Sequence, residues 1–203
     1  MKYLVMILLL VPAFAQADDR FGVIGGLTFA NVRGAGDGYD WQSYFLPGFY
    51  ADLGLSENAF ITPQLRYMRK GASLADTITS GYADITLALK YLELPIYFKY
   101  KFPGGTSVRP NLFVGPAFGV KLGESISVTD RFTGKVTTLR HLDSGSLRKY
   151  DVALEAGGGV EFMLSADMVG SLSVAYSYGL IDLDKEATKV KTQGIQVYAG
   201  IGF

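Results

Sequence analysis

The only histidine of the chain, His141, lies close to residues that could support hydrolysis. Asp143, Ser144 and Ser146 follow it, and a serine activated by a histidine is the minimum of a hydrolase site. The group falls in the longest connection between the strand-like segments. We therefore predict a solvated loop histidine here, and we retain a membrane-embedded hydrolase acting on lipid as an alternative.

Three further stretches contain groups that bind ions or phosphates in other proteins. Asp182, Asp184 and Glu186 alternate, but they lack the spacing and the turn glycine of an EF-hand and indicate a hydrated loop. The Gly-Ala-Gly-Asp-Gly stretch at 34–38 lacks the lysine and the strand-to-helix context of a phosphate loop. The glycines at 157–159 fall inside a strand pattern, where we expect them to relieve crowding.

Composition excludes several classes of site and partner. Cysteine is absent, so disulfides, thiolate metal sites and cysteine nucleophiles are excluded. Lys and Arg number 19 against 19 Asp and Glu, so no long-range field attracts nucleic acid. We predict no cofactor and no nucleic-acid partner.

Two long segments, 91–102 and 108–122, alternate between apolar and polar residues as strands do. On the first, the apolar face from Leu92 to Phe102 carries no charge, whereas the other face holds Glu93 and two lysines. These apolar faces run for six to eight residues, so the segments exceed the ~5–6 residues of a typical strand. They suit a transmembrane strand of ~9–11 residues.

The same alternation recurs along the chain and predicts eight strands in total. The other six are expected at 21–32, 44–55, 60–70, 150–164, 170–180 and 192–203. The connections alternate between long loops at 33–42, 71–84, 123–149 and 181–191 and tight turns at 56–58, 103–106 and 165–168. Loops sorted in this way are typical of bacterial outer-membrane barrels. The predicted fold is all-β, an eight-stranded antiparallel up-and-down transmembrane β-barrel.

The longest connection contains one more strand pattern, around Thr133 and Gly134. Polar residues fall on both of its faces, so it offers no side to lipid. We expect a hairpin that extends the flanking strands beyond the membrane.

Five prolines lie within the predicted strands, where each removes a hydrogen-bond donor. A closed barrel has no free edge to accommodate them. For Pro47, Pro63 and Pro110 we expect bulges or positions near the rim, whereas Pro95 and Pro116 fall in segments for which a family resemblance is given below.

The polar faces of the strands carry a balanced set of charges. A barrel of about eight strands has an interior that side chains just fill, and ion pairs would satisfy charges there. The predicted lumen network contains Asp52, Glu93, Asp151, Glu155, Glu161, Arg66, Lys99, Lys101, Arg109 and Lys121. The alternative is that these charges cover the solvated face of a soluble sheet.

Aromatic residues are expected in two girdles, where rings meet lipid headgroups. The turn-side girdle contains Phe21, Tyr100, Phe102, Phe162 and Phe203. The loop-side girdle contains Phe29, Phe45, Tyr67, Phe118 and Tyr178.

The first 17 residues have the features of a secretory signal peptide. Lys2 supplies the positive charge, an apolar run follows, and Ala15-Gln16-Ala17 is the small-x-small cleavage site. We predict a signal peptide over 1–17 and one outer-membrane β-barrel domain over 18–203.

Five segments resemble those of a known family. They are GVIGGLTFANV, YLELPIYFKYKF, RPNLFVGPAFGV, ALEAGGGVEF and YSYGLIDLD. With a final strand ending in Phe203, they resemble the PorT-like outer-membrane β-barrel family, which is similar in architecture to small OmpA/OmpX-type barrels. The resemblance implies a location in the outer membrane of a Gram-negative bacterium, surrounded by outer-membrane lipid. It also implies that Phe203 is the signal by which the barrel-assembly machinery recognises the chain during insertion.

The favoured hypothesis is a non-enzymatic integral outer-membrane barrel with a packed polar lumen. Its extracellular loops would serve envelope structure, adhesion or a secretion assembly, with an extracellular or secretion-system protein as partner. A narrow porin-like channel is an alternative if the charge network opens. The hydrolase stays open as well, as does a secreted lipocalin-like binder, which would need an apolar interior.

Overall fold

The computed structural model describes residues 19–33, 39–75, 83–103, 107–130, 133, 136–140, 148–182 and 190–203. The predicted signal peptide and the 34–38 stretch lie outside these ranges, as do His141, Asp143, Ser144, Ser146, Asp184 and Glu186. Within the described ranges, no helix is long and apolar enough to cross a bilayer.

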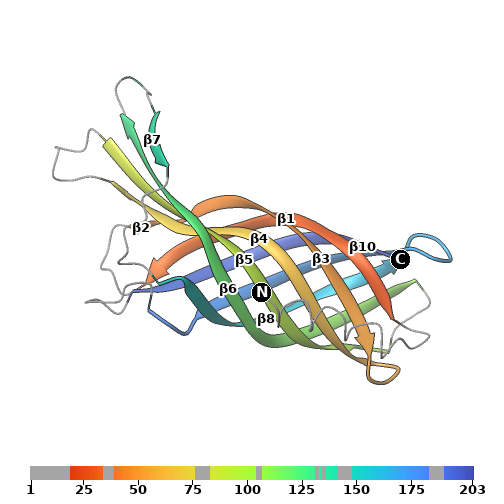
Figure 1. Ribbon diagram of the computed structural model, residues 1–203. Coiled ribbons are helices and arrows are strands. Elements are labelled where there is room, and N and C mark those ends of the chain that lie inside the picture. Colours follow the sequence, from red (N-terminus) through yellow and green to blue (C-terminus); the bar gives the residue numbers. More distant parts are fainter. Residues whose placement is uncertain are drawn as a thin grey trace.

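Eight antiparallel strands close into a barrel (Figure 1). They are β1 (Arg20–Arg33), β3 (Gln42–Gly54), β4 (Ala59–Ala75), β5 (Ala83–Lys101), β6 (Val108–Asp130), β8 (Tyr150–Met163), β9 (Val169–Gly179) and β10 (Lys191–Gly202). Each strand pairs with the next, and β1 closes the barrel by pairing with β10. Closure leaves no strand edge in the wall. The predicted fold is confirmed.

The barrel continues beyond the membrane on its loop side. The two short strands β2 (Tyr39–Asp40) and β7 (Val136–Arg140) pair with β4 and β6. In Figure 1 the ends of β5 and β6 project from the barrel together with β7. The hairpin expected in the longest connection is therefore present.

The prediction of a long loop over 71–84 is wrong, because β4 and β5 remain paired as far as Ala75 and Asp84. The sequence pattern missed this extension for a physical reason. Beyond the lipid both faces of a strand meet water, so backbone pairing continues without apolar alternation.

The outer face of the barrel is apolar between its two girdles. Phe45 and Phe49 are each 64% exposed. Nine of the ten residues predicted for the girdles are exposed, and the tenth, Tyr67, is half-buried. Phe21 and Phe29, one in each girdle, are eight residues apart on β1, which corresponds to roughly 20 Å across the membrane at about 3.3 Å per residue and a tilt of about 40°. This is near the ~25 Å apolar band of outer-membrane barrels.

Aromatic rings inside the barrel lie against glycines of the neighbouring strands. Tyr50 is the cross-strand partner of Gly22, and Phe113 is the partner of Gly157. A Cβ atom at Gly157 would lie 2.6 Å from Phe113 Cζ, and one at Gly22 would lie 2.4 Å from Tyr50 Cε1. An eight-stranded lumen is just filled by side chains, so each ring needs a partner position without one.

Three prolines interrupt the strand ladder on one side only. Among the described strands, Pro63 pairs with β5 but not with β3, Pro95 with β6 but not with β4, and Pro116 with β8 but not with β5. In an antiparallel sheet each residue directs its N–H toward one neighbour, so the missing donor weakens one side of the ladder.

The bulge expected at Pro63 is wrong, because the register with β3 is the same on both sides of it. At Pro47 the ladder to β1 is unbroken, whereas the pairing with β4 ends at Gly48 and resumes at Asp40 with the register shifted by one residue. Pro110 lies near the turn-side rim, two residues into β6. A proline on a long strand can therefore lose one bond without a change of register.

Adjacent glycines of β1 give a matched test of the packing inside the barrel. A Cβ at Gly26 would lie 2.2 Å from the carbonyl oxygen of Val197, whereas one at Gly25 would meet only Phe45 Cζ at 4.0 Å. We expect Gly26→Ala to lower the free energy of unfolding by about 1–3 kcal/mol through overpacking. Gly25→Ala should change it by less than about 0.5 kcal/mol.

The measurement is urea unfolding of the refolded barrel, followed by its heat-dependent gel mobility. Equal midpoints for the two glycine variants would contradict the close packing at Gly26.

Candidate functional site

A cluster of four charged side chains fills the turn-side half of the lumen. Lys99 Nζ lies 2.8 Å from Asp52 Oδ1 and 3.4 Å from Glu161 Oε1. Lys101 Nζ lies 2.8 Å from Asp52 Oδ2 and 2.9 Å from Glu161 Oε2. Thr62 donates a further hydrogen bond of 2.6 Å to Asp52. Two cations and two carboxylates thus neutralise each other within one layer.

A second cluster is centred on Arg66 of β4, which is fully buried. One terminal nitrogen donates to Glu93 at 2.7 Å and to Glu155 at 2.8 Å. The other donates to the Tyr97 hydroxyl at 3.0 Å and to Gln196 Oε1 at 2.7 Å. Tyr97 donates in turn to Glu155. One guanidinium therefore joins side chains from three other strands.

Lys70 continues this cluster toward the loop side. Its Nζ lies 2.6 Å from Glu93 Oε1 and 2.8 Å from Asp151 Oδ2. The sequence analysis missed Lys70. It lies four residues after Arg66 on the same strand, so both side chains point to the same face and into the lumen. The central cluster, extended by Lys70, contains two cations and three carboxylates.

Eight of the ten residues predicted for the lumen network lie in these two clusters. Arg109, one of the two exceptions, lies half-buried at the turn-side rim. It donates to the carbonyl of Glu57 at 3.3 Å and to Asn58 Oδ1 at 3.2 Å. Because Arg109 comes directly after the first residue of β6, it reaches the adjacent turn rather than the interior.

Lys121, the other exception, forms a separate pair on the loop side. Its Nζ lies 2.9 Å from Glu124 Oε2, and both side chains are nearly buried. Glu124 was missed because the predicted strand ended at Leu122, whereas β6 continues to Asp130. The interior charges thus continue toward the projecting hairpin.

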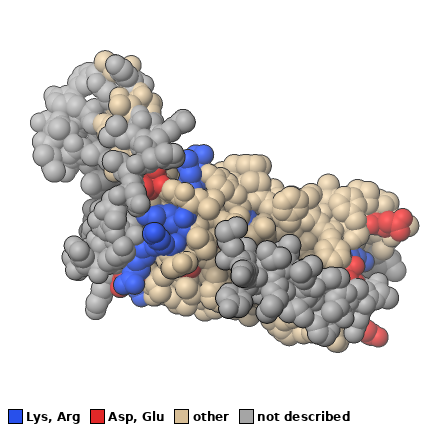
Figure 2. All heavy atoms as spheres, in the orientation of Figure 1, with Lys and Arg blue, Asp and Glu red and all other residues tan. Residues whose placement is uncertain are grey.

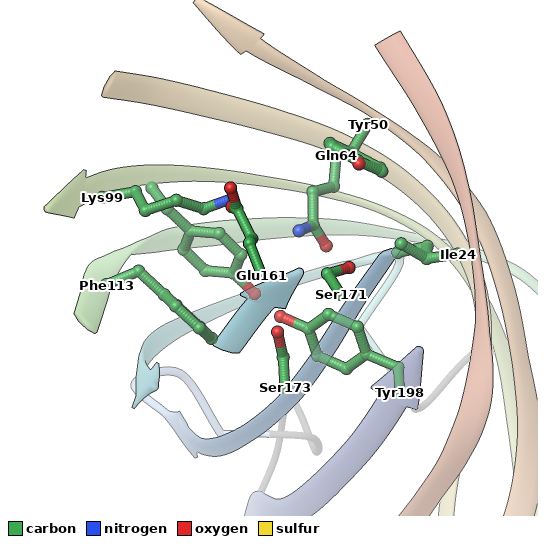
Figure 3. A pocket seen from close by; sticks show the side chains of 10 residues that line it. Ile24, Tyr50, Gln64, Lys99, Phe113, Glu161, Ser171, Ser173 and Tyr198 are labelled. Atoms are coloured by element: carbon green, nitrogen blue, oxygen red, sulfur yellow. The ribbon is translucent and has the colours of Figure 1, made fainter. Parts of the chain in front are cut away.

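Two small cavities lie beside these clusters. A cavity of about 10 Å³ is lined by aromatic and charged side chains from several strands, among them Tyr50, Lys99, Phe113 and Tyr198 (Figure 3). A second cavity of about 10 Å³ lies beside Lys70. A space of this size holds about one water molecule.

A larger space of about 100 Å³ opens at the turn-side mouth, next to Arg20 and Arg109. In the described part of the chain, no three acidic or histidine side chains are placed to hold a metal ion. Phe203 ends the chain at this same mouth, where its N–H donates to the carbonyl of Phe21 at 2.8 Å. It is 63% exposed, and its role as an assembly signal stays a prediction.

Comparison with known families agrees with this architecture. A family model described as "Outer membrane protein beta-barrel domain" matches residues 14–185. The chain belongs to this family. Its location is accordingly the outer membrane of a Gram-negative bacterium. The narrower PorT-like name stays a prediction, and no curated protein matches the chain.

Solved structures similar to this outer-membrane barrel share its fold at low sequence identity. Neisserial surface protein A is 15% identical with a TM-score of 0.51, covering 90% of this chain and 97% of its own. A major outer membrane protein from Thermus thermophilus is 13% identical with a TM-score of 0.52, covering 91% and 99%. The outer membrane protease OmpT from Escherichia coli is 10% identical with a TM-score of 0.45, covering 94% and 97%. Likeness at these identities shows the fold alone.

Among the lumen residues, Arg66 is the one whose replacement should lower the free energy of unfolding most. Arg66→Met leaves Glu93 paired with Lys70 but removes the ion-pair partner of Glu155, so we expect a loss of about 3–5 kcal/mol in the free energy of unfolding. Adding Glu155→Gln removes the uncompensated charge, and the double variant should recover part of that loss. The measurement is the urea midpoint of the folded gel band.

The matched control is Arg69→Met, because Arg69 lies on the same strand and is exposed on the opposite face. It should shift the free energy of unfolding by no more than about 0.5 kcal/mol. A double variant no more stable than Arg66→Met alone would contradict the assigned role of Glu155.

Proposed function

We propose that this protein is a non-enzymatic, non-conducting outer-membrane barrel that presents its loop-side extension to a partner outside the cell. The observation that carries the proposal is the lumen, in which nine buried charges form two ion-pair clusters. A lumen closed in this way makes the barrel a rigid support, and it leaves the loop side as the region open to interaction.

The clusters argue against a pore. Ions would have to pass Arg66 and Tyr97, which are completely buried and hydrogen-bonded to each other. Opening a path would separate several buried ion pairs at once, and breaking one such pair by removing a partner costs about 3–5 kcal/mol. The same interior does not suit a lipocalin-like binder, which needs an apolar cavity.

The support for a non-enzymatic role is that the lumen carboxylates are engaged in ion pairs rather than presented to a substrate. Glu155, for example, accepts bonds from Arg66, Tyr97 and Gln196. A hydrolase centred on His141 is the remaining enzymatic alternative.

The loop-side extension supplies a surface suited to protein contact. β6 has 23 residues, about twice the ~9–11 that cross a membrane. Among the described strands, β7 pairs only with β6, so its other edge could receive a strand of a partner by β-augmentation. We propose adhesion, envelope structure or a secretion assembly as the setting of this contact, and Phe203 as the element read by the barrel-assembly machinery.

Conductance in a planar lipid bilayer tests the packed lumen. We expect no unitary current from the folded wild-type barrel. The double variant Arg66→Ser with Tyr97→Ser replaces two large plugging side chains by small ones and should conduct, which shows that the assay detects this barrel when it is open. Steady unitary currents from the wild type would instead establish the porin-like alternative.

The hydrolase alternative is tested separately in cells. We expect His141→Ala to leave the lipid composition of the envelope equal to that of the wild type, because no lipid chemistry depends on it. Deletion of the whole protein is the comparison. If deletion and His141→Ala changed the same lipid products, the protein would be an enzyme and the proposal would fail.

A further inference from the structure

Charged side chains on the surface of the barrel are unevenly distributed between its two ends. The described side chains on the loop side of the girdles include the bases Arg33, Arg69, Lys90, Arg148, Lys149 and Lys191 and the acids Asp40 and Asp182. Those at the turn end include Arg20, Arg109, Asp19, Glu57 and Asp167. Figure 2 shows blue atoms gathered where the barrel meets its loop-side end, and a middle that is largely tan. Among the described side chains, those of the loop-side rim therefore carry a positive net charge.

Four of these residues form two like-charged pairs across neighbouring strands. Arg33 of β1 lies directly opposite Lys191 of β10, and Arg69 of β4 lies directly opposite Lys90 of β5. All four belong to the outward face of their strands. Like charges directly opposite each other destabilise a sheet. We name these four residues the basic band.

Within the described part of the chain, no ion pair includes a member of the basic band. Two of them are nonetheless held in place. The Arg33 guanidinium lies 3.5 Å from the centroid of the Tyr178 ring and donates to the carbonyl of Gly179 at 2.8 Å. Lys191 donates to the carbonyl of Leu180 at 2.9 Å. The cations are thus positioned without losing their charge.

The depth of the basic band identifies what it meets. Arg69 lies two residues beyond Tyr67, and Arg33 lies four residues beyond Phe29. At about 3.3 Å per residue and a tilt of about 40°, these positions are roughly 5–10 Å beyond the loop-side girdle. Girdle rings lie at the boundary of the hydrocarbon, so the band lies among the lipid headgroups.

We propose that the basic band binds the phosphate groups of lipids in the outer leaflet. Each pair offers two cations to one doubly charged phosphate, and the anion removes the repulsion between them. An arginine adds directed N–H donors that match phosphate oxygens. The proposal rests on the outer-membrane location of the barrel and is independent of whether its lumen conducts.

The test measures lipid bound to the folded barrel in neutral detergent by native mass spectrometry. The probe is a bisphosphorylated lipid A glycolipid, with phosphatidylcholine as the comparison lipid. We expect preferential binding of lipid A that weakens as salt is added. At about fivefold per cation removed, Arg69→Gln with Lys90→Gln should weaken it about 25-fold, and Arg33→Gln with Lys191→Gln should do the same.

The matched control is the charge-retaining exchange Arg69→Lys with Lys90→Arg, which should bind within about twofold of the wild type. Arg20→Gln at the turn end should also leave binding unchanged. Heat-dependent gel mobility verifies that every variant is folded. Wild-type affinity in the variant lacking all four cations would overturn the proposal. Displacement of lipid A by equimolar inorganic phosphate would also overturn it, because a soluble anion would then be the ligand.

Discussion

Arg66 is buried completely, and the interior of the barrel depends on how its charge is compensated. Its guanidinium binds Glu93 and Glu155 on two other strands, and Lys70 then completes the pairing of Glu93. A buried charge without a partner is far more costly than a paired one. The network therefore links β4 to its neighbour β5 and, across the lumen, to β8.

Packing supplies the second constraint on the interior. Rings such as Tyr50 and Phe113 occupy space that the opposing Gly22 and Gly157 leave free. Charged and aromatic side chains pack the middle of the lumen around cavities of about 10 Å³, and a space of about 100 Å³ opens at the turn-side mouth. A lumen filled in this way cannot yield at one point without disturbing its neighbours. The same packed side chains therefore stabilise the barrel and fill its lumen.

The outside of the barrel is organised by the membrane rather than by the lumen. Between its girdles, the wall presents apolar side chains to lipid, and Phe45 and Phe49 remain largely exposed. Beyond the loop-side girdle the described surface side chains are mainly basic, and the strands continue into water as the β5, β6 and β7 extension. The same strands therefore meet three environments in sequence, and the residue types change where the environment changes.

Alternation along single strands determined the eight-stranded barrel, because one face of each strand must be apolar over the thickness of a bilayer. It also placed Arg66, Glu93 and Glu155 in the lumen, since successive side chains of a strand point to opposite faces. Alternation could not determine which charges form ion pairs, because pairing across the lumen depends on the register and shear between strands distant in sequence. Only the tertiary structure therefore joined Arg66 to Glu155, moved Arg109 to the rim, and extended the strands where no lipid required alternation.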